Sequence, residues 1–229
     1  MTSIESEMPR TIFIGDVHGC VDELKALVKR LRIQPEDRVI LTGDLINRGP
    51  DSAGVVRYVH EAGFETVMGN HDDEYLREYE TKEEYKNLRR EIGSELHAWL
   101  SERPLFIESD RFLVVHAGLE PGKHPSQSRR GLVMNIRTWD GTGEKLNSPD
   151  NPPWYEFYTG EKPVIYGHWA RRGLTLRGNT IGLDSGCCYG RALSAWVLET
   201  RELIQETAHR HWYIPPSLRE ALKNEKDPN

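Results

Sequence analysis

The sequence has few cysteines, no long apolar run and no excess of positive charge. Three cysteines in 229 residues, of which Cys187 and Cys188 are adjacent, exclude a disulfide framework and predict reduced, partly buried thiols. No apolar stretch approaches the roughly 20 residues that span a bilayer, so we expect no membrane partner. Met1 to Arg10 lack the apolar stretch of a secretory signal, and we therefore predict a cytoplasmic protein.

The charge balance argues against non-specific nucleic-acid binding. Lys and Arg number 30 against 36 Asp and Glu, and the formal net charge is −6. Binding to a phosphate backbone requires clustered positive charge. The sequence also lacks internal repeats, low-complexity segments and a shift in composition, and its 37% hydrophobic content suits an ordinary core. We predict a single domain over residues 1–229.

Four short apolar runs each end beside a glycine and a residue type that binds metals. The runs are Ile12–Ile14, Arg38–Thr42, Thr66–Met68 and Leu113–Val115. They lead into Gly15-Asp16-Val17-His18-Gly19, Gly43-Asp44, Gly69-Asn70-His71-Asp72 and His116-Ala117-Gly118. One such junction is equally typical of an ordinary turn. Its recurrence favours buried strands that deliver metal ligands to one edge of a sheet.

Helical periodicity follows the first three of these strands. Apolar residues recur at helical spacing in Val21, Leu24, Leu27, Val28 and Leu31. A second helix is predicted to begin near Asp51, a plausible N-cap. The charged stretch after Asn70 predicts a helical insertion around residues 72–103, most of whose charges face solvent. Strand, loop and helix in alternation predict α/β units.

Beyond residue 110 the pattern changes to strands and irregular loops. The segment around 118–163 is rich in Gly, Pro, Asn and Ser, which is typical of a functional loop or lid, and we expect it to form a substrate wall. Its Trp139 and Trp154 either stack on a base or lie buried in a hydrophobic cluster. Ala192–Leu198 and Leu203–Thr207 predict a final antiparallel pair.

The residues at the strand ends form a candidate metal-binding set. They are Asp16, His18, Asp44, Asn70, His116 and His168, the last of which follows the apolar run 164–166. Carboxylate, imidazole and amide ligands suit two divalent transition-metal ions, in first place Mn²⁺, with Fe, Zn²⁺ or Co²⁺ as alternatives. Six ligands are too many for one tetrahedral site but fit two ions about 3.5–4 Å apart, with the central Asp44 as the predicted bridge.

The five motifs GDVHG, GDLINRG, GNHD, HAG and GH resemble the signature of the phosphoprotein-phosphatase branch of the calcineurin-like metallophosphoesterases. More narrowly, Tyr166–Ala170, Leu183–Gly190 and the pair Gly49-Pro50 resemble the bacterial symmetrical diadenosine tetraphosphatases and their relatives. The resemblance implies an α/β (α+β) fold, a β-sandwich of mixed sheets flanked by helices with the dimetal site at the strand ends. It also implies that one metal is held by Asp16, His18 and Asp44, and the other by Asp44, Asn70, His116 and His168.

Two metals and a phosphorylated substrate predict direct attack of a metal-bound hydroxide on phosphorus. Arg48 is predicted to hold the phosphate, and His71 to protonate the leaving oxygen. Arg137 is a further predicted phosphate ligand. Four more arginines are weaker candidates, namely Arg129, Arg130, Arg171 and Arg172.

Asn47 departs from the protein-phosphatase pattern, which reads Gly-Asp-x-x-Asp-Arg-Gly. An amide oxygen can accept the imidazole N–H of His71 but does not stabilise the charge of an imidazolium, so His71 is expected to be a weakened acid. A serine alkoxide needs that proton more than a nucleotide phosphate does. The sequence therefore favours phosphoanhydride hydrolysis of dinucleoside polyphosphates. A phosphoprotein (Ser/Thr/Tyr) phosphatase is the alternative, and a non-catalytic phospho-ligand binding module is the third hypothesis.

Overall fold

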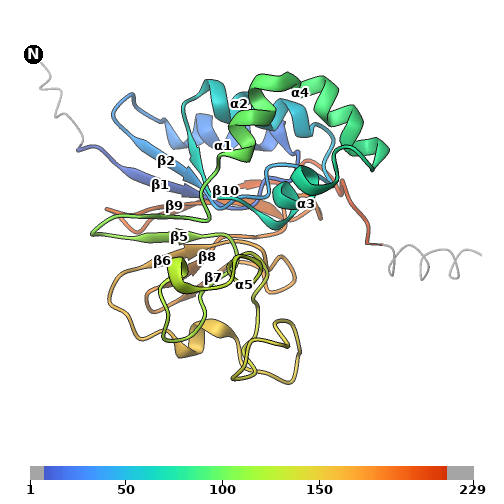
Figure 1. The fold of residues 1–229 in the computed structure, drawn as a ribbon. Helices are drawn as coiled ribbons and strands as arrows, with labels where there is room; N and C mark the ends of the chain where they lie inside the picture. The colour runs from blue at the N-terminus through green and yellow to red at the C-terminus, as the bar shows by residue number, and fades with distance from the viewer. Residues whose placement is uncertain (1–7, 216–229) are drawn as a thin grey trace, which may run out of the picture.

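Two five-stranded mixed sheets form the centre of the computed structural model, which describes residues 8–215 (Figure 1). The first sheet has the order β10 (Leu203–Thr207), β9 (Ala192–Val197), β1 (Thr11–Ile14), β2 (Arg38–Leu41) and β3 (Glu65–Thr66). The second has the order β4 (Phe106–Glu108), β5 (Leu113–Val115), β6 (Val164–Tyr166), β8 (Thr180–Gly182) and β7 (Thr175–Arg177). The expected sandwich of mixed sheets is confirmed. The predicted domain limits at residues 1 and 229 lie outside the described residues.

Side chains on successive positions of β1 face different layers of the core, as a period of two requires. Ile12 and Ile14 belong to the cluster under the helices, whereas Phe13 belongs to the cluster between the sheets. The Phe13 ring meets Phe112 edge-on, with centroids 5.0 Å apart, and stacks on Trp196 at 6.0 Å. A strand buried on both faces explains the continuous apolar run in the sequence.

Parallel pairing determines where the loops lie. In the first sheet β1 pairs with β2 and β2 with β3 in parallel, and in the second sheet β5 pairs with β6 and β6 with β8 in parallel. The carboxyl ends of parallel strands meet at one edge of a sheet. The predicted antiparallel pair of β9 and β10 is present.

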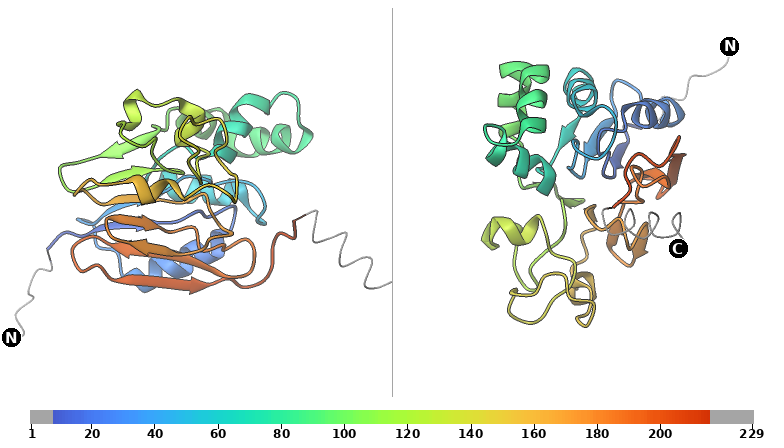
Figure 2. Two further views of the ribbon diagram at one scale, coloured as in Figure 1. Left: turned by 90° about the horizontal axis from the view of Figure 1, so that it is seen from below. Right: turned by 90° about the vertical axis from the view of Figure 1, so that its right-hand side faces the viewer.

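Four helices lie on the outer face of the first sheet, where Figure 2 shows them as one layer. They are α1 (Val21–Leu31), α2 (Ser52–Glu61), α3 (Asn70–Glu78) and α4 (Glu83–Ser101). Asp51 caps α2 as predicted, because its carboxylate accepts a 2.6 Å hydrogen bond from the Gly54 amide. The stretch predicted as a helical insertion forms α3 and α4, and α4 is kinked at Gly93, whose φ is 76°.

The segment 118–163 covers the outer face of the second sheet and is less irregular than expected. It contains the short helix α5 (Arg130–Val133) and two 3₁₀ turns, η1 (Pro125–Gln127) and η2 (Trp154–Phe157). Leu132, Val133 and Trp154 pack with residues of β5 and β6 in one buried cluster. This packing replaces the regular helices that cover the first sheet.

Three strand predictions differ from the structure. β4 and β7 were not predicted; both are edge strands whose residues are partly exposed, so neither has the buried apolar run on which the prediction depended. The strand predicted at Thr66–Met68 is paired with β2 in register only at Thr66 and at the preceding Glu65. The Val67 amide still donates to the Leu41 carbonyl of β2 at 3.2 Å, but the Met68 amide turns away and donates to the Pro104 carbonyl at 2.7 Å.

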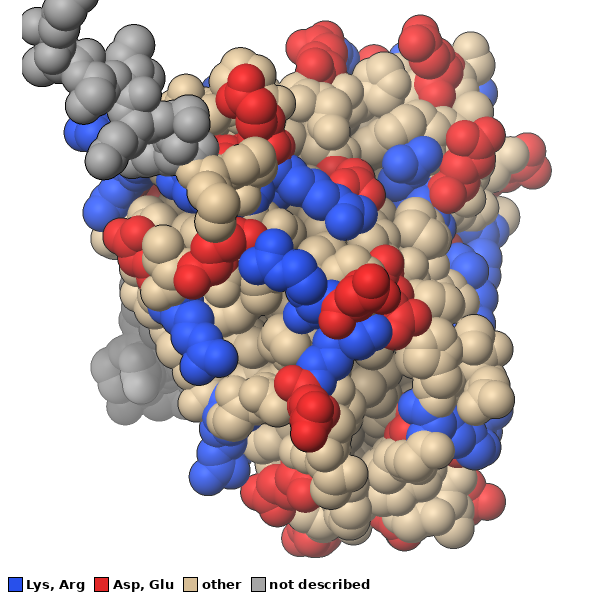
Figure 3. Space-filling view, turned by 90° about the vertical axis from the view of Figure 1, so that its left-hand side faces the viewer, with Lys and Arg blue, Asp and Glu red and all other residues tan. Residues whose placement is uncertain are grey.

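The face in Figure 3, seen from the left-hand side of Figure 1, carries basic and acidic side chains interspersed with one another. Neither sign forms a continuous patch there. Within residues 8–215 no helix combines the length and apolarity that crossing a membrane requires.

Candidate dinuclear metal centre

Asp44 lies at the middle of a convergent set of polar side chains, directly after β2. Its Oδ1 accepts a 2.9 Å hydrogen bond from the His71 amide. Its Oδ2 lies 3.5 Å from Nε2 of His18 and 3.5 Å from Nε2 of His116. A carboxylate oxygen between two imidazoles occupies the position expected of a ligand shared by two ions.

Backbone strain is concentrated around this carboxylate. Five of the seven described non-glycine residues with positive φ belong to the predicted site, namely His18, Asp44, Asn47, Arg48 and His168. Such left-handed conformations cost about 1–2 kcal/mol each, and they persist only where the surrounding structure imposes them. The fold therefore opposes local preference here to aim these side chains inward.

Glycines let the ligand loops approach one another. A Cβ on Gly69 would lie 2.2 Å from Asp44 Oδ1, and one on Gly167 would lie 1.8 Å from Asp16 Oδ1. Both distances are far below van der Waals contact. Glycine is therefore required at these two positions for the close approach of the loops.

His116, Asn70 and His168 meet at one oxygen. The His116 Nδ1–H donates to the Thr42 carbonyl at 2.7 Å, which leaves the Nε2 lone pair facing Asn70 Oδ1 at 2.9 Å. His168 Nδ1 lies 2.8 Å from the same oxygen. Burial, with help from His116, lowers the pKa of His168 well below its usual value, so its imidazole is neutral. Lone pairs that face one another across less than 3 Å fit a divalent cation, which each of them can bind.

His18 and Asp16 complete the set on the first sheet. His18 Nδ1 donates to the Ile46 carbonyl at 2.9 Å, and burial lowers the pKa of His18 to about 3, which makes Nε2 a neutral ligand. Asp16 accepts from the Thr42 hydroxyl and the His168 amide, both at 2.9 Å. Burial, followed by repulsion from Asp184 and Asp44, raises the pKa of Asp16, and a bound cation would remove that penalty.

The structure brings all six predicted ligands together. Two groups of possible ligand atoms share Asp44, each within 4.8 Å: Asp16 with Asp44 and His116, and His18 with Asp44 and His71. His71 was predicted as the acid, not as a ligand. The assignment of each ligand to one of two ions therefore stays a prediction.

The contact between Asn47 and His71 differs from the expected one. The amide nitrogen Nδ2 of Asn47, not its oxygen, lies 3.1 Å from His71 Nδ1 and 2.8 Å from the Tyr85 hydroxyl. An amide N–H only donates, so His71 Nδ1 accepts and the ring proton stays on Nε2. Burial lowers the pKa of His71, and Arg48 lowers it further. The inferred weakness of the acid thus has a second cause, because protonating Nδ1 would set two N–H groups against each other.

Asp72 was not assigned a role from the sequence, although it is fully buried beside the centre. Its Oδ1 accepts from the Leu45 amide at 3.0 Å and its Oδ2 from the Gly69 amide at 3.1 Å. Burial and Asp44 raise its pKa to about 7. Asp72 ties the loop of Asp44 to the loop of Asn70, and its place in the first turn of α3, after Gly69, is the signal that marks it as a cap.

Sequence and structure comparisons agree with this geometry. The family model described as calcineurin-like phosphoesterase matches residues 9–172. The chain belongs to the calcineurin-like phosphoesterases. It is a metal-dependent phosphohydrolase, and it has candidate ligand groups for the dinuclear divalent metal centre of this family.

Named relatives cover nearly the whole chain. The symmetrical bis(5'-nucleosyl)-tetraphosphatase of Methylobacillus flagellatus is 29% identical over 264 residues, which cover 87% of this chain and 95% of the relative. The enzyme of the same name from Vibrio parahaemolyticus is 27% identical, with 86% and 98% covered. The crystal structure of a candidate diadenosine tetraphosphatase superposes with a TM-score of 0.79 at 33% identity, with 89% and 95% covered. These findings confirm the resemblance inferred from the motifs.

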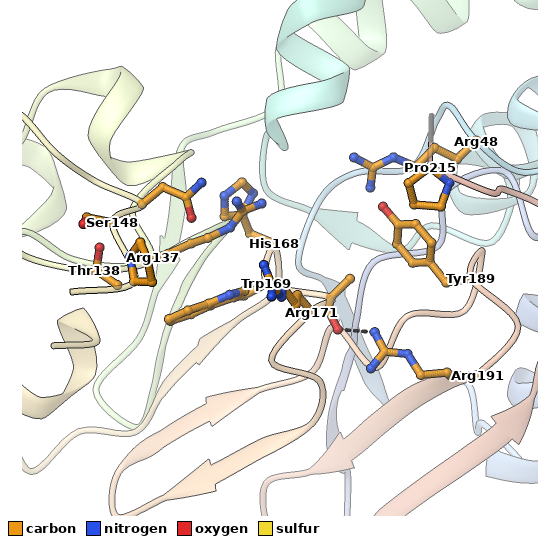
Figure 4. A pocket seen from close by; sticks show the side chains of 13 residues that line it. Arg48, Arg137, Thr138, Ser148, His168, Trp169, Arg171, Tyr189, Arg191 and Pro215 are labelled. Carbon is orange, nitrogen blue, oxygen red and sulfur yellow. Dashed lines mark hydrogen bonds between the residues drawn. The ribbon is translucent and has the colours of Figure 1, made fainter. Parts of the chain in front are cut away.

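The phosphoesterase has a cavity of about 520 Å³ beside the metal centre (Figure 4). Four arginines contribute to its lining, namely Arg48, Arg137, Arg171 and Arg191, and none of its described lining residues is a carboxylate. Trp169 and Tyr189 add aromatic surface, and His168 lines its wall next to the centre. We call it the arginine cavity.

Arg48 and Arg137 reach the arginine cavity from opposite sides in Figure 4. The guanidinium of Arg48 lies beside the adjacent rings of Tyr189 and Tyr213, 5.5 and 5.7 Å from their centroids, and donates from Nη1 to His18 Nε2 at 2.8 Å. Nε of Arg137 is buried and has no hydrogen-bond partner among the described residues. Burial lowers the pKa of Arg137. An unpartnered buried cationic group beside a metal centre suits an anion.

The weaker arginine candidates are mostly engaged elsewhere. Arg130 pairs with Asp73 at 2.6 Å, and Arg129 donates to the Gly143 carbonyl at 2.8 Å. The guanidinium of Arg172 lies 5.7 Å from the Trp169 ring, outside the lining. Of the four, only Arg171 lines the cavity. Spacing in the sequence did not separate these arginines because their partners come from distant segments.

Of the two alternatives for the tryptophans of the wall segment, Trp154 follows burial in a hydrophobic cluster. Its side chain is 1% exposed and packs in the cluster over the second sheet. Trp139 packs against the same cluster and lies outside the lining of the cavity. The described tryptophan that lines the cavity is Trp169, next to the candidate ligand His168.

Proposed function

We propose that this phosphohydrolase cleaves phosphoanhydride bonds of dinucleoside polyphosphates such as diadenosine tetraphosphate. The observation that carries the proposal is the arginine cavity, which joins cationic and aromatic side chains beside the metal centre. Cationic side chains bind a polyphosphate, and aromatic side chains stack on a nucleobase. The names of the relatives, which cover most of both chains, support the same substrate class.

Each predicted residue has a defined task in this proposal. Divalent ions, when bound, lower the pKa of a water and offset the charge that develops on the phosphoryl oxygens. Arg48 and Arg137 orient the phosphates with their guanidinium groups. His71 is the proposed acid: in its imidazolium form it gives the Nε2 proton to the leaving oxygen and keeps the proton on Nδ1, although the amide nitrogen of Asn47 that faces Nδ1 disfavours this form.

Manganese is the proposed metal, because imidazole, amide and carboxylate ligands occur together without a thiolate. Elemental analysis of the purified protein tests this choice directly. Iron, zinc and cobalt remain the alternatives. The cytoplasmic location also stays a prediction, which fractionation of the producing cells would test.

A panel of substrates tests the proposed function. With Mn²⁺ present we expect kcat/KM for diadenosine tetraphosphate to exceed that for phosphoserine and phosphotyrosine peptides by at least about 100-fold. Asp44→Asn protein serves as the blank for contaminating activity. Faster turnover of either phosphopeptide would replace the proposal with a protein phosphatase, and binding without turnover of any substrate would favour a non-catalytic module.

A further inference from the structure

A second cavity lies on the other side of Arg48. It has a volume of about 570 Å³ and shares Arg48 with the arginine cavity. Four carboxylate residues contribute to its lining, namely Asp51, Glu74, Glu84 and Glu91, and Arg48 is the only Lys or Arg among its lining residues in the described chain. We call it the acidic cavity.

Two of these carboxylates have no opposing charge within the described part of the chain. Asp51 caps α2 and Glu74 pairs with Lys82. Glu84 and Glu91, by contrast, are exposed and form no ion pair with another described residue. They lie seven positions apart on α4, and therefore on the same face of the helix. This face presents uncompensated negative charge to the cavity.

The position of His71 indicates which half of the substrate each cavity holds. His71 and Asn47 line only the acidic cavity, whereas the metal-ligand candidate His168 lines only the arginine cavity. The group that receives the proton of His71 is the leaving oxygen. The leaving half of the substrate must therefore extend into the acidic cavity, and the half whose phosphorus is attacked into the arginine cavity.

We propose that the opposite charges of the two cavities divide the substrate, so that the arginines retain one nucleotide and the carboxylates on α4 expel the other. In the reaction the oxygen of a water adds to phosphorus, and the electron pair of the broken P–O bond goes to the leaving phosphate. The proton of His71 goes to the oxygen of this leaving phosphate, and one proton of the water goes to solvent. The new terminal hydroxyl has a pKa of about 6, so it ionises at pH 7 and the released phosphate carries more negative charge than it did in the dinucleotide. Repulsion from Glu84 and Glu91 then weakens its binding as product, while the neutral nucleoside can still donate hydrogen bonds to them.

This inference rests on the proposed function, but its main test does not need turnover. ADP binding to the Mn²⁺-loaded protein is measured by calorimetry for the wild type, for Glu84→Gln/Glu91→Gln and for Arg171→Gln. Coulomb interactions with exposed carboxylates predict about three- to tenfold tighter ADP binding to the double variant at low salt, and a smaller gain at high salt. Arg171→Gln is expected to weaken ADP binding by a similar factor.

Glu95→Gln is the matched control, since Glu95 is also exposed on α4 but lies outside the acidic cavity. Its ADP affinity is expected to equal that of the wild type. The proposal would be overturned if the ADP affinity of the double variant equals that of the wild type, or if Glu95→Gln shows the same increase in ADP affinity as the double variant. If the double variant behaves as expected while diadenosine tetraphosphate is not hydrolysed, the proposed substrate fails and the charge division stands.

Kinetics gives a second readout. The double variant should show stronger inhibition by ADP in the turnover of diadenosine tetraphosphate, whereas kcat for p-nitrophenyl phosphate should stay within about twofold, because nitrophenol carries no phosphate into the acidic cavity. An equal change for both substrates would mean that α4 acts on the metal centre itself, and would contradict the proposal.

Discussion

The ligands of the metal centre and the side chains of the two cavities come from different kinds of segment. Asp16, Asp44 and His116 follow their strands within one to three residues and are at most 2% exposed. The cavity walls come from loops and from the exposed face of a helix, as Arg137, Arg171 and Glu91 show. A ligand held by buried strands has one available position, whereas a wall residue can be exchanged without moving the sheets. The difference predicts that mutations at the centre remove the chemistry, and mutations in the walls change what is bound.

Asp44→Asn should have the largest effect. Because both groups of ligand atoms include this carboxylate, we expect kcat to fall by at least about 10³-fold and both ions to be lost together. Elemental analysis and kcat measure the two effects. Asp73→Asn, one residue beyond Asp72 and paired with surface arginines, is the control. A fully active wild-type protein with a single ion would contradict the shared-ligand role.

Arg48→Ala and Arg137→Gln test the wall nearest the centre. Loss of a guanidinium that holds a phosphate should lower kcat/KM for diadenosine tetraphosphate by about 100-fold for Arg48 and about tenfold for Arg137. Arg130→Gln should leave it unchanged, since Arg130 pairs with Asp73 away from the cavity. If Arg137→Gln matches the Arg130→Gln control, the unpartnered Nε of Arg137 does not mark a phosphate site.

Asn47→Asp acts where the centre meets the acidic cavity. A carboxylate beside Nδ1 stabilises the imidazolium, so the pKa of His71, now lowered by burial, should rise. The rate on phosphoserine should increase by about tenfold relative to the rate on the anhydride, whose leaving group needs the proton less. Activity that depends on protonated His71 is lost as pH rises through its pKa, and this loss should therefore move to higher pH. Steady-state rates on both substrates from pH 5 to 9 measure this; equal effects would show that Asn47 does not tune the acid.

Trp169→Leu and Trp154→Leu separate a wall residue from a core residue. Trp169 lines the cavity, so its loss should raise KM for the dinucleotide by about three- to tenfold and leave p-nitrophenyl phosphate unaffected. Trp154 is buried, so its loss should instead lower the free energy of unfolding by about 2–4 kcal/mol. Denaturant titration and KM on both variants distinguish the two roles. If the KM for the dinucleotide rises in Trp154→Leu but not in Trp169→Leu, the two assigned roles are contradicted.

The amino-acid sequence alone was enough to predict which polar side chains converge at the candidate metal centre. Asp16, Asp44 and Asn70 follow apolar runs of the first sheet, and His116 and His168 follow runs of the second, so the parallel order within each sheet brings each group to one edge. The packing of the two sheets then joins the two edges. Local preferences also predicted the cap at Asp51. These inferences succeeded because each depends on neighbours within a few positions along the chain and on the common direction of parallel strands.

Tertiary structure decided what surrounds that centre. Arg129, Arg130 and Arg137 lie within nine positions of one another, yet Arg137 alone faces the cavity, because Gly143 and Asp73 hold the other two. Trp154 fills the core over the second sheet, while Trp169 lines the wall. The edge strands β4 and β7 and the amide orientation of Asn47, which is held by Tyr85 from a distant helix, also depend on long-range contacts. Hydrophobic and charge patterns carry information only about neighbours on the same segment of the chain. Which arginine is paired, which tryptophan is buried and where the edge strands form depend on partners from distant segments, which only the fold brings into contact.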